Sequence, residues 1–227
     1  MSACEATTVA TVATATIGTD HLDLPWLAAQ GVHAASAPGC NADSVVQWLA
    51  AALLSHALPL LRRARAGEAP VAGVVGVGNV GRRAARLLEA LGFQVLRCDP
   101  PRQRREAACA AFLPLDALLG RCDLLTLHVP LTRAPQDPDA TEGLLDAARV
   151  QALRPGVVLV NACRGEVLGE RGQPVLLAAR AGRFAALLLD VFPGEPRPEP
   201  ALVDVATVAT AHIAGHSLEG KINGTRM

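Results

Sequence analysis

The stretch VAGVVGVGNVG, residues 71–81, joins an apolar run to three glycines and then to a helical pattern. Gly76, Gly78 and Gly81 have the spacing G-x-G-x-x-G, which permits a tight turn and brings backbone N–H groups close to a pyrophosphate. A helix that begins at this turn directs the positive end of its dipole to the same place. The stretch therefore predicts the first strand, turn and helix of a dinucleotide-binding fold.

The next apolar run, FQVLRCD, ends in Asp99, eighteen residues beyond Gly81. A carboxylate at the end of the second strand can accept hydrogen bonds from the adenosine ribose hydroxyls, and it repels a 2′-phosphate. We therefore expect the cofactor to be NAD and not NADP, although the nearby Arg102 would favour NADP. A glycine-rich turn without a ligand is the alternative, and this context makes it the weaker one.

Short apolar runs alternate with helical patterns from residue 71 onward. Runs that are almost continuously apolar are typical of parallel strands buried on both faces. Their alternation with helices predicts an α/β fold with a doubly wound parallel sheet. The predicted strands are VAGVVG (71–76), FQVLRCD (93–99), DLLTLHV (123–129), GVVLVNA (156–162), FAALLLDVF (184–192) and VATVATA (205–211).

The residues before this sheet divide into two parts. Residues 41–66 have a helical pattern, with Asn41 as a plausible N-cap, and Pro59 should bend or end the helix. Residues 1–40 predict a strand, a short helix and a second short strand, which is too little for a domain. We expect residues 1–40 to be a remnant of a substrate domain, 41–211 to form the dinucleotide-binding domain, and 212–227 to return toward the substrate domain.

Composition argues against several classes of partner. Lys plus Arg equals Asp plus Glu at 21 each, so no net charge attracts nucleic acid or an anionic membrane surface. No run of 18 or more apolar residues suggests a transmembrane helix, and the N-terminus lacks the basic region of a signal peptide. The 6 cysteines form no CxxC pair and have no histidine at metal-ligand spacing. We expect free thiols in a reducing cytoplasm and no metal site.

Polar residues follow three successive strands of the predicted sheet. Arg164, Asp190 and His212 each come directly after an apolar run, and Glu195 lies in the proline-rich loop after Asp190. Because the carboxyl ends of parallel strands open onto the ligand crevice, these side chains should converge on the crevice of the glycine turn. A glutamate near a histidine orients the imidazole and favours its protonated form. Each residue alone could be a surface charge, but the group is harder to explain in that way.

The segments NACRG, LDVFPGEP and TAHIAGHS resemble signature segments of the D-isomer-specific 2-hydroxyacid dehydrogenases. TATIGTDHLDL, SAPGCNADSVV, CDPPRQ and HIAGHSLEGK resemble, more narrowly, a branch of that family that oxidises a phosphorylated 2-hydroxy acid. The resemblance implies a Rossmann-type NAD-binding domain with a partial, flavodoxin-like substrate domain. It also implies hydride transfer to NAD from a small phosphorylated substrate, and a homodimer.

The resemblance also implies roles for individual residues. Arg164, Glu195 and His212 would be catalytic, with Arg164 forked onto the carboxylate and 2-oxygen of the substrate. Thr16 would contact the substrate, and so would His216, which stands where this branch usually has tyrosine. Asp190 would lie on the nicotinamide carboxamide side. The full cofactor-binding set expected is Gly76, Gly78, Asn79, Val80, Gly81, Asp99, Val129, Ala162, Cys163, Asp190 and Gly215.

Members of this family carry further strands before the TIGTD segment and a dimerisation region after the SLEGK segment. We therefore expect this chain to hold only part of the substrate domain and to lack the C-terminal dimerisation region. Two alternatives stay open on the sequence alone. One is a different dehydrogenase of the same family, and the other is a catalytically impaired fragment that binds NAD(H).

Overall fold

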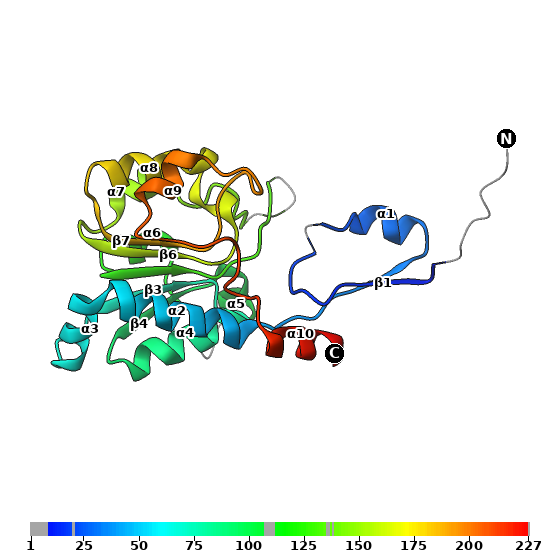
Figure 1. Cartoon of the computed structure of the whole chain (residues 1–227), viewed down its shortest axis with the longest axis horizontal. Coiled ribbons are helices and arrows are strands. Elements are labelled where there is room, and N and C mark those ends of the chain that lie inside the picture. Colours follow the sequence, from blue (N-terminus) through cyan, green and yellow to red (C-terminus); the bar gives the residue numbers. More distant parts are fainter. Residues whose placement is uncertain (1–8, 20, 107–111, 135–136, 138, 227) are drawn as a thin grey trace.

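A parallel sheet of six strands forms the centre of the molecule (Figure 1). The computed structural model describes residues 9–19, 21–106, 112–134, 137 and 139–226. The strand order is β4-β3-β5-β6-β7-β8, and every neighbouring pair is parallel. The strands are β3 (Val71–Val75), β4 (Gln94–Cys98), β5 (Leu124–Leu127), β6 (Val157–Asn161), β7 (Phe184–Leu189) and β8 (Val208–Ala209).

All six strands lie within the runs predicted from the sequence, which confirms the doubly wound α/β fold. The order reverses at β3, because β4 lies on one side of β3 and β5 on the other. Ligands of such sheets bind beyond the carboxyl ends of the strands at this reversal.

The prediction of a strand over 205–211 was wrong in its first residues. Pro200 begins a helix that continues to Val205, and only two residues pair with β7.

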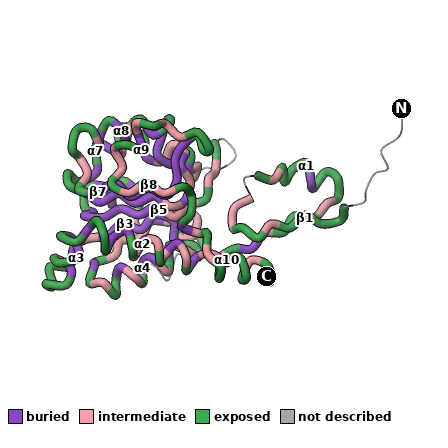
Figure 2. Tube along the Cα trace, viewed as in Figure 1, coloured by how far each residue is buried: buried purple, intermediate pink, exposed green. Residues whose placement is uncertain are grey.

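Helices lie on both faces of the sheet, whose strands are mostly buried (Figure 2). Successive residues of a strand point to opposite faces and so pack against different helices. Leu124 and Val158 pack with buried residues of α2, α3 and α4, whereas Leu125 and Leu159 pack with those of α6, α7, α8 and α9. The helices are α2 (Ala42–His56), α3 (Leu58–Arg65), α4 (Asn79–Ala90), α5 (Pro100–Arg105), α6 (Leu115–Leu119), α7 (Ala147–Ala152), α8 (Gln173–Arg180) and α9 (Pro200–Val205), with short 3-10 turns at Gly165–Leu168 and Glu170–Gly172.

The helix expected over 41–66 is broken near Pro59, as predicted. Helices α2 and α3 meet at 95°, and Pro59 lies in the first turn of α3, where its missing N–H costs least. Asn41 flanks α2 as expected, but its side chain makes no capping hydrogen bond. Within the described residues, no single helix is long and apolar enough to cross a membrane; only α2 and α3 taken together, with their bend, match on length and composition.

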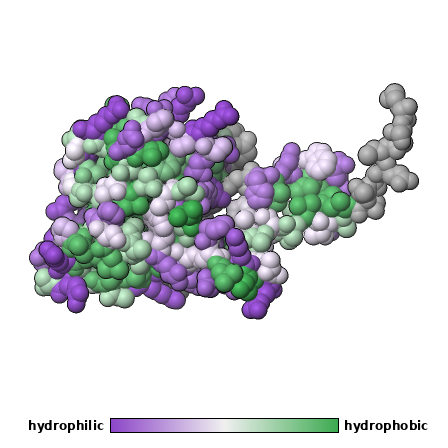
Figure 3. Space-filling view, viewed as in Figure 1, coloured by the Kyte–Doolittle hydropathy of each residue, from purple (hydrophilic) through white to green (hydrophobic). Residues whose placement is uncertain are grey.

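The N-terminal residues form a small unit of their own. Strands β1 (Thr11–Ala13) and β2 (His33–Ala35) pair in parallel, with α1 (Leu24–Ala29) between them in the sequence. This unit extends away from the main sheet, and α10 (Leu218–Arg226) lies between the two (Figure 1). Figure 3 shows hydrophobic side chains on its surface, and Trp26 is 57% exposed. The strand–helix–strand prediction is confirmed, while the domain bounds at 40/41 and 211/212 stay predictions.

Candidate active site

The turn between β3 and α4 has a different role for each of its glycines. Gly76 has a φ of 82°, and a Cβ atom there would overlap the carbonyl group of His128. A Cβ atom at Gly81 would overlap the carbonyl oxygen of Gly76, so the fold itself requires both glycines. Gly78 faces open space, and as the N-cap of α4 it offers no side chain to the free N–H groups. An anion such as a pyrophosphate fits against the free N–H groups of this helix, which begins at Asn79.

Asp99 lies beside the same turn, at the end of β4. Its Oδ2 atom accepts a hydrogen bond from the backbone N–H of Val77 at 2.8 Å, and Oδ1 accepts one from that of Arg102 at 2.9 Å. The carboxylate is thus held against the glycine turn, where the sequence placed the adenosine ribose. The guanidinium of Arg102 bonds to Glu106 in an ion pair of 2.6 Å. Its charge is therefore paired with a carboxylate of the same short helix.

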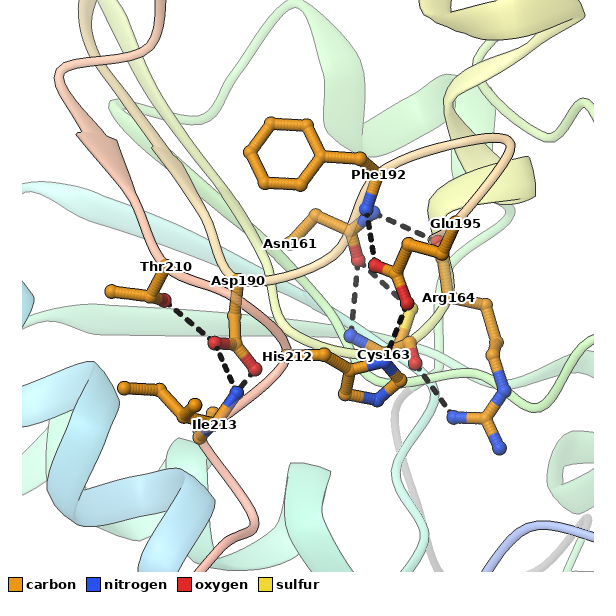
Figure 4. Close-up of polar contacts among 10 residues, drawn as sticks. Asn161, Cys163, Arg164, Asp190, Phe192, Glu195, Thr210, His212 and Ile213 are labelled. Atoms are coloured by element: carbon orange, nitrogen blue, oxygen red, sulfur yellow. Dashed lines mark hydrogen bonds and ion pairs between the residues drawn. The ribbon is translucent and has the colours of Figure 1, made fainter. Parts of the chain in front are cut away.

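Glu195 and His212 form a hydrogen-bonded pair between the loop after β7 and the loop after β8 (Figure 4). Oε2 of Glu195 lies 2.7 Å from Nδ1 of His212, while Oε1 accepts a hydrogen bond from the backbone N–H of Phe192 at 2.8 Å. Because Nδ1 is held by the carboxylate, Nε2 on the far side of the ring is left to a reactant. The His212 side chain is 49% exposed, so a reactant can reach it.

Arg164 follows β6 in a turn that Asn161 holds (Figure 4). The fully buried side-chain amide of Asn161 donates to the carbonyl of Arg164 at 2.9 Å, and its Oδ1 accepts from the backbone N–H of Cys163 at 3.1 Å. A Cβ atom at Gly165 would overlap the backbone of Phe192, so the arginine turn packs directly on the loop that carries the glutamate. The structure thus brings the three predicted catalytic residues to one place.

Asp190 is buried beneath the loop that carries His212. Its carboxylate accepts hydrogen bonds from the backbone N–H groups of Ile213 and Ala214, both at 2.8 Å, and from the hydroxyl of Thr210 at 2.6 Å. Its backbone carbonyl accepts the N–H of His212 at 2.8 Å. The structure therefore gives Asp190 an anchoring role that the sequence analysis did not foresee. The role expected toward the nicotinamide stays a prediction.

The other predicted site residues lie in three places. Val129 packs beside Gly76, and Ala162 and Cys163 follow β6, where burial raises the pKa of the Cys163 thiol to about 11. The chain that follows β8 passes the start of α2, where Gly215 packs against the Asn41 side chain. Val80 lies in the first turn of α4. His216 lies in the chain before α10, where its backbone N–H donates to the carbonyl of Ile213. Thr16 is exposed in the N-terminal unit, and its hydroxyl donates to the carbonyl of Gly18.

Sequence reasoning missed Asn161, Phe192 and Thr210, which orient the predicted catalytic residues. Asn161 and Thr210 left one signal, because each is a polar residue at the end of an apolar strand run. The backbone N–H of Phe192 left none. A hollow of about 390 Å³ opens beside Glu195 and His212. Among the residues that the structure describes, no group of three or more His, Cys, Asp or Glu could hold a metal ion.

Comparison with known families gives one description for most of the chain. The family model described as "D-isomer specific 2-hydroxyacid dehydrogenase, NAD binding domain" matches residues 61–214. That segment contains the glycine turn, Arg164 and the Glu195–His212 pair.

Among curated proteins, the erythronate-4-phosphate dehydrogenase of Salinibacter ruber is 49% identical over 95% of this chain and 54% of its own length. The protein of the same name from Pseudomonas aeruginosa strain UCBPP-PA14 is 47% identical over 94% of this chain and 54% of its own length. The chain therefore spans about half the length of the curated relatives that it matches.

Among solved structures, the D-lactate dehydrogenase of Aquifex aeolicus, complexed with NAD and lactic acid, superposes with a TM-score of 0.78. It is 25% identical, and the match covers 95% of this chain and 73% of that one. The apo D-mandelate dehydrogenase of Rhodotorula graminis gives a TM-score of 0.77 at 25% identity, over 95% of this chain and 69% of that one.

Proposed function

The chain belongs to the D-isomer specific 2-hydroxyacid dehydrogenase family, and on that premise we propose that it oxidises erythronate 4-phosphate with NAD. The product would be 3-hydroxy-2-oxo-4-phosphooxybutanoate, an intermediate of vitamin B6 biosynthesis. The names of the curated relatives support the choice of substrate. The observation that carries the reaction type is the 2.7 Å contact between Glu195 and His212 beside the turn of Arg164.

NAD, when bound, accepts a hydride from C2 of the substrate. In this chain the open backbone at Gly78 and the uncapped first turn of α4 would hold the pyrophosphate, and Asp99 the adenosine ribose. Val129, Cys163 and the backbone near Gly215 would line the nicotinamide end. The fit rests on the glycine cradle, where two glycines close the turn and one leaves it open.

His212 would act as the general base. Its Nε2 takes the proton of the C2 hydroxyl, and the C2–H bond gives up its electron pair as the hydride. The resulting imidazolium is stabilised by Glu195, which already holds Nδ1 and is itself fixed by the N–H of Phe192. The two protein groups thus move one proton without relocating either side chain.

Arg164 would orient the substrate. Its guanidinium is planar and always charged, so it can donate two parallel hydrogen bonds to the carboxylate next to C2. Holding C2 in one orientation speeds the reaction, because the reacting groups no longer have to find the correct geometry by diffusion and rotation. Thr16 and His216 would contact the remainder of the substrate from the N-terminal unit and from the chain before α10.

The surroundings of the enzyme follow from the same proposal. We place it in the cytoplasm with neither nucleic acid nor membrane partners, and we assign the homodimer to the full-length members of the family. The free, buried thiols of Cys40, Cys98, Cys122 and Cys163 suit a reducing compartment. Cys4 and Cys109 lie outside the described residues.

The substrate is tested by measuring NADH formation with erythronate 4-phosphate, unphosphorylated erythronate and D-lactate in parallel. We expect the highest kcat/KM with erythronate 4-phosphate. A preference for D-lactate would contradict the proposed substrate and point to another dehydrogenase of the family. Since the chain matches only about half the length of its relatives, a fragment that binds NADH without turnover is the second candidate. Tight NADH binding with no turnover on any of the three acids would favour it.

A further inference from the structure

A chain of hydrogen bonds leads from helix α2 to the loop that carries His212. The indole Nε1–H of Trp48 donates to the hydroxyl of Thr210 at 3.1 Å, and that hydroxyl donates to Oδ1 of Asp190 at 2.6 Å. The directions are fixed by chemistry, because an indole N–H only donates and a carboxylate only accepts. The hydroxyl of Thr210 therefore links Asp190 to Trp48, which lies 162 positions before Thr210 in the sequence.

The end of this chain holds an unusual backbone. His212 has a φ of 54°, in the left-handed region that few residues other than glycine adopt. Its conformation is fixed from beneath, where the carboxylate of Asp190 binds the N–H groups of the next two residues (Figure 4). Asp190 is 1% exposed, and a buried carboxylate needs hydrogen bonds in place of the lost water. The hydroxyl of Thr210 supplies the shortest of them.

We propose that Thr210 and Trp48 are positioning residues for His212, and that they connect the acid–base site to α2. This inference rests on the proposed function for its effect on turnover, but its geometry does not. Thr210 fixes the carboxylate of Asp190, and Asp190 fixes the backbone of His212, so the direction of Nε2 depends on the hydroxyl of Thr210. Trp48 fixes that hydroxyl in turn.

The test compares two substitutions at Thr210 that differ in one atom group. Thr210→Val keeps the shape and removes the hydroxyl, whereas Thr210→Ser keeps the hydroxyl. We expect Thr210→Val to lower kcat by about tenfold, the size of one lost hydrogen bond, with an unchanged dissociation constant for NADH. Thr210→Ser should stay close to wild type. Equal kcat for Thr210→Val and wild type, or equal losses in both variants, would overturn the proposal.

A second readout does not depend on activity. In NMR spectra, the ring C–H signals of His212 should move in Thr210→Val and stay in place in Thr210→Ser. The indole N–H signal of Trp48 should also move in Thr210→Val, while that of Trp26, exposed on α1, should not. Unmoved His212 signals in Thr210→Val would overturn the positioning role. If these signals move as expected but the wild-type chain turns over no substrate, the proposed function fails and the geometry of the inference stands.

Trp48→Phe provides the third arm, with Trp26→Phe as its matched control. Trp48→Phe keeps an aromatic ring in the cluster beneath α2 but removes the donor to Thr210. We expect a loss of kcat smaller than that of Thr210→Val, together with a shift of the His212 signals in the same direction. Trp26→Phe should change neither. A Trp48→Phe variant with unaltered kcat and His212 signals would remove Trp48 from the proposal.

Discussion

Asp99, which we propose binds the adenosine ribose, also supports the turn beside it. Both carboxylate oxygens already accept backbone N–H groups, one from the glycine turn and one from the first turn of α5. Each carboxylate oxygen has further acceptor capacity, so the ribose hydroxyls can still bind. Substituting Asp99 should therefore remove both the proposed contact with the ribose and a support of the turn.

For Asp99→Ala we expect NADH to bind about tenfold more weakly, with a smaller loss for NADPH, whose 2′-phosphate the carboxylate repels. The ratio of the two affinities should fall. Fluorescence titration with both dinucleotides measures the change, and Asp116→Ala, an exposed carboxylate on α6, serves as the control. Equal affinities for NADH and NADPH in the wild-type chain would contradict the ribose assignment.

His128, at the end of β5, gives the chain a dependence of stability on pH. Its Nε2 lies 2.9 Å from the hydroxyl of Thr126, and burial lowers the pKa of His128 from 6.5 to about 4. The folded state thus binds the proton less readily than the unfolded state. The stability contributed by the neutral imidazole is complete above pH 6.5 and is lost as the pH falls toward 4.

We expect the free energy of unfolding to fall by about 2 kcal/mol more between pH 7 and pH 5 in the wild type than in His128→Gln. Urea unfolding at the two pH values measures the difference. His33→Gln, on the exposed strand β2, should behave as the wild type. Parallel losses in wild type and His128→Gln would show that another group controls the acid sensitivity.

Among the elements, the turn from β3 to α4 contains glycines that the fold requires and one glycine that we assign to cofactor binding. Gly81 is packed against the carbonyl oxygen of Gly76, but Gly78 faces open space with a φ of −77° that any residue adopts. Sequence spacing alone identifies all three glycines without distinguishing these roles, because the distinction lies in what each Cα faces.

Gly81→Ala should lower the melting temperature strongly or prevent folding, since its methyl group overlaps the backbone of the turn. Gly78→Ala should keep the melting temperature within a few degrees and still weaken NADH binding by about tenfold or more, because its methyl group occupies the approach of the pyrophosphate. Thermal unfolding and NADH titration of both variants test this pair. An unchanged NADH affinity in Gly78→Ala would contradict the proposal that the pyrophosphate binds at this turn.

The helical elements show where sequence patterns succeed. Pro59 predicted the break between α2 and α3, because a proline N–H is missing and its ring excludes the preceding turn. The pattern failed over 205–207, where an apolar run continued through the end of α9 into β8. Apolar periodicity does not distinguish a short buried helix end from a strand, and Pro200 was the only local mark of the helix.

In the whole molecule, the N-terminal unit is much less buried than the main sheet. All of β2 is exposed, and the hydrophobic Trp26 lies on the surface, whereas the strands of the main sheet are mostly buried. The buried clusters of the described chain belong to residues 49–202. The main sheet therefore carries its own core.

A fragment of residues 37–227 should fold and bind NADH with an affinity within about threefold of the whole chain, a difference of less than 1 kcal/mol. Circular dichroism during heating and NADH titration measure the two properties. A fragment that fails to fold, or that loses NADH binding, would show that the main sheet depends on the N-terminal unit.

The sequence predicted the sheet and the convergence of the candidate site residues at its carboxyl edge, because buried strands are apolar and polar residues follow them. It could not predict how those residues are held. The bonds from Asn161 to the Arg164 turn and from Trp48 to Thr210 depend on side-chain directions that only the packed structure sets. Glu195 was predicted to orient His212, and the 2.7 Å contact agrees with that expectation, while their catalytic roles stay proposals.

We propose that His212 removes a proton while NAD accepts the hydride, and NADH formation from NAD and erythronate 4-phosphate measures this reaction. The rate is measured for the wild-type chain and for His212→Asn, whose asparagine tolerates the positive φ of this position. We expect His212→Asn to form NADH about 10²–10⁴-fold more slowly, with a nearly unchanged affinity for NADH. Equal rates in the two proteins, with NADH bound by both, would contradict it.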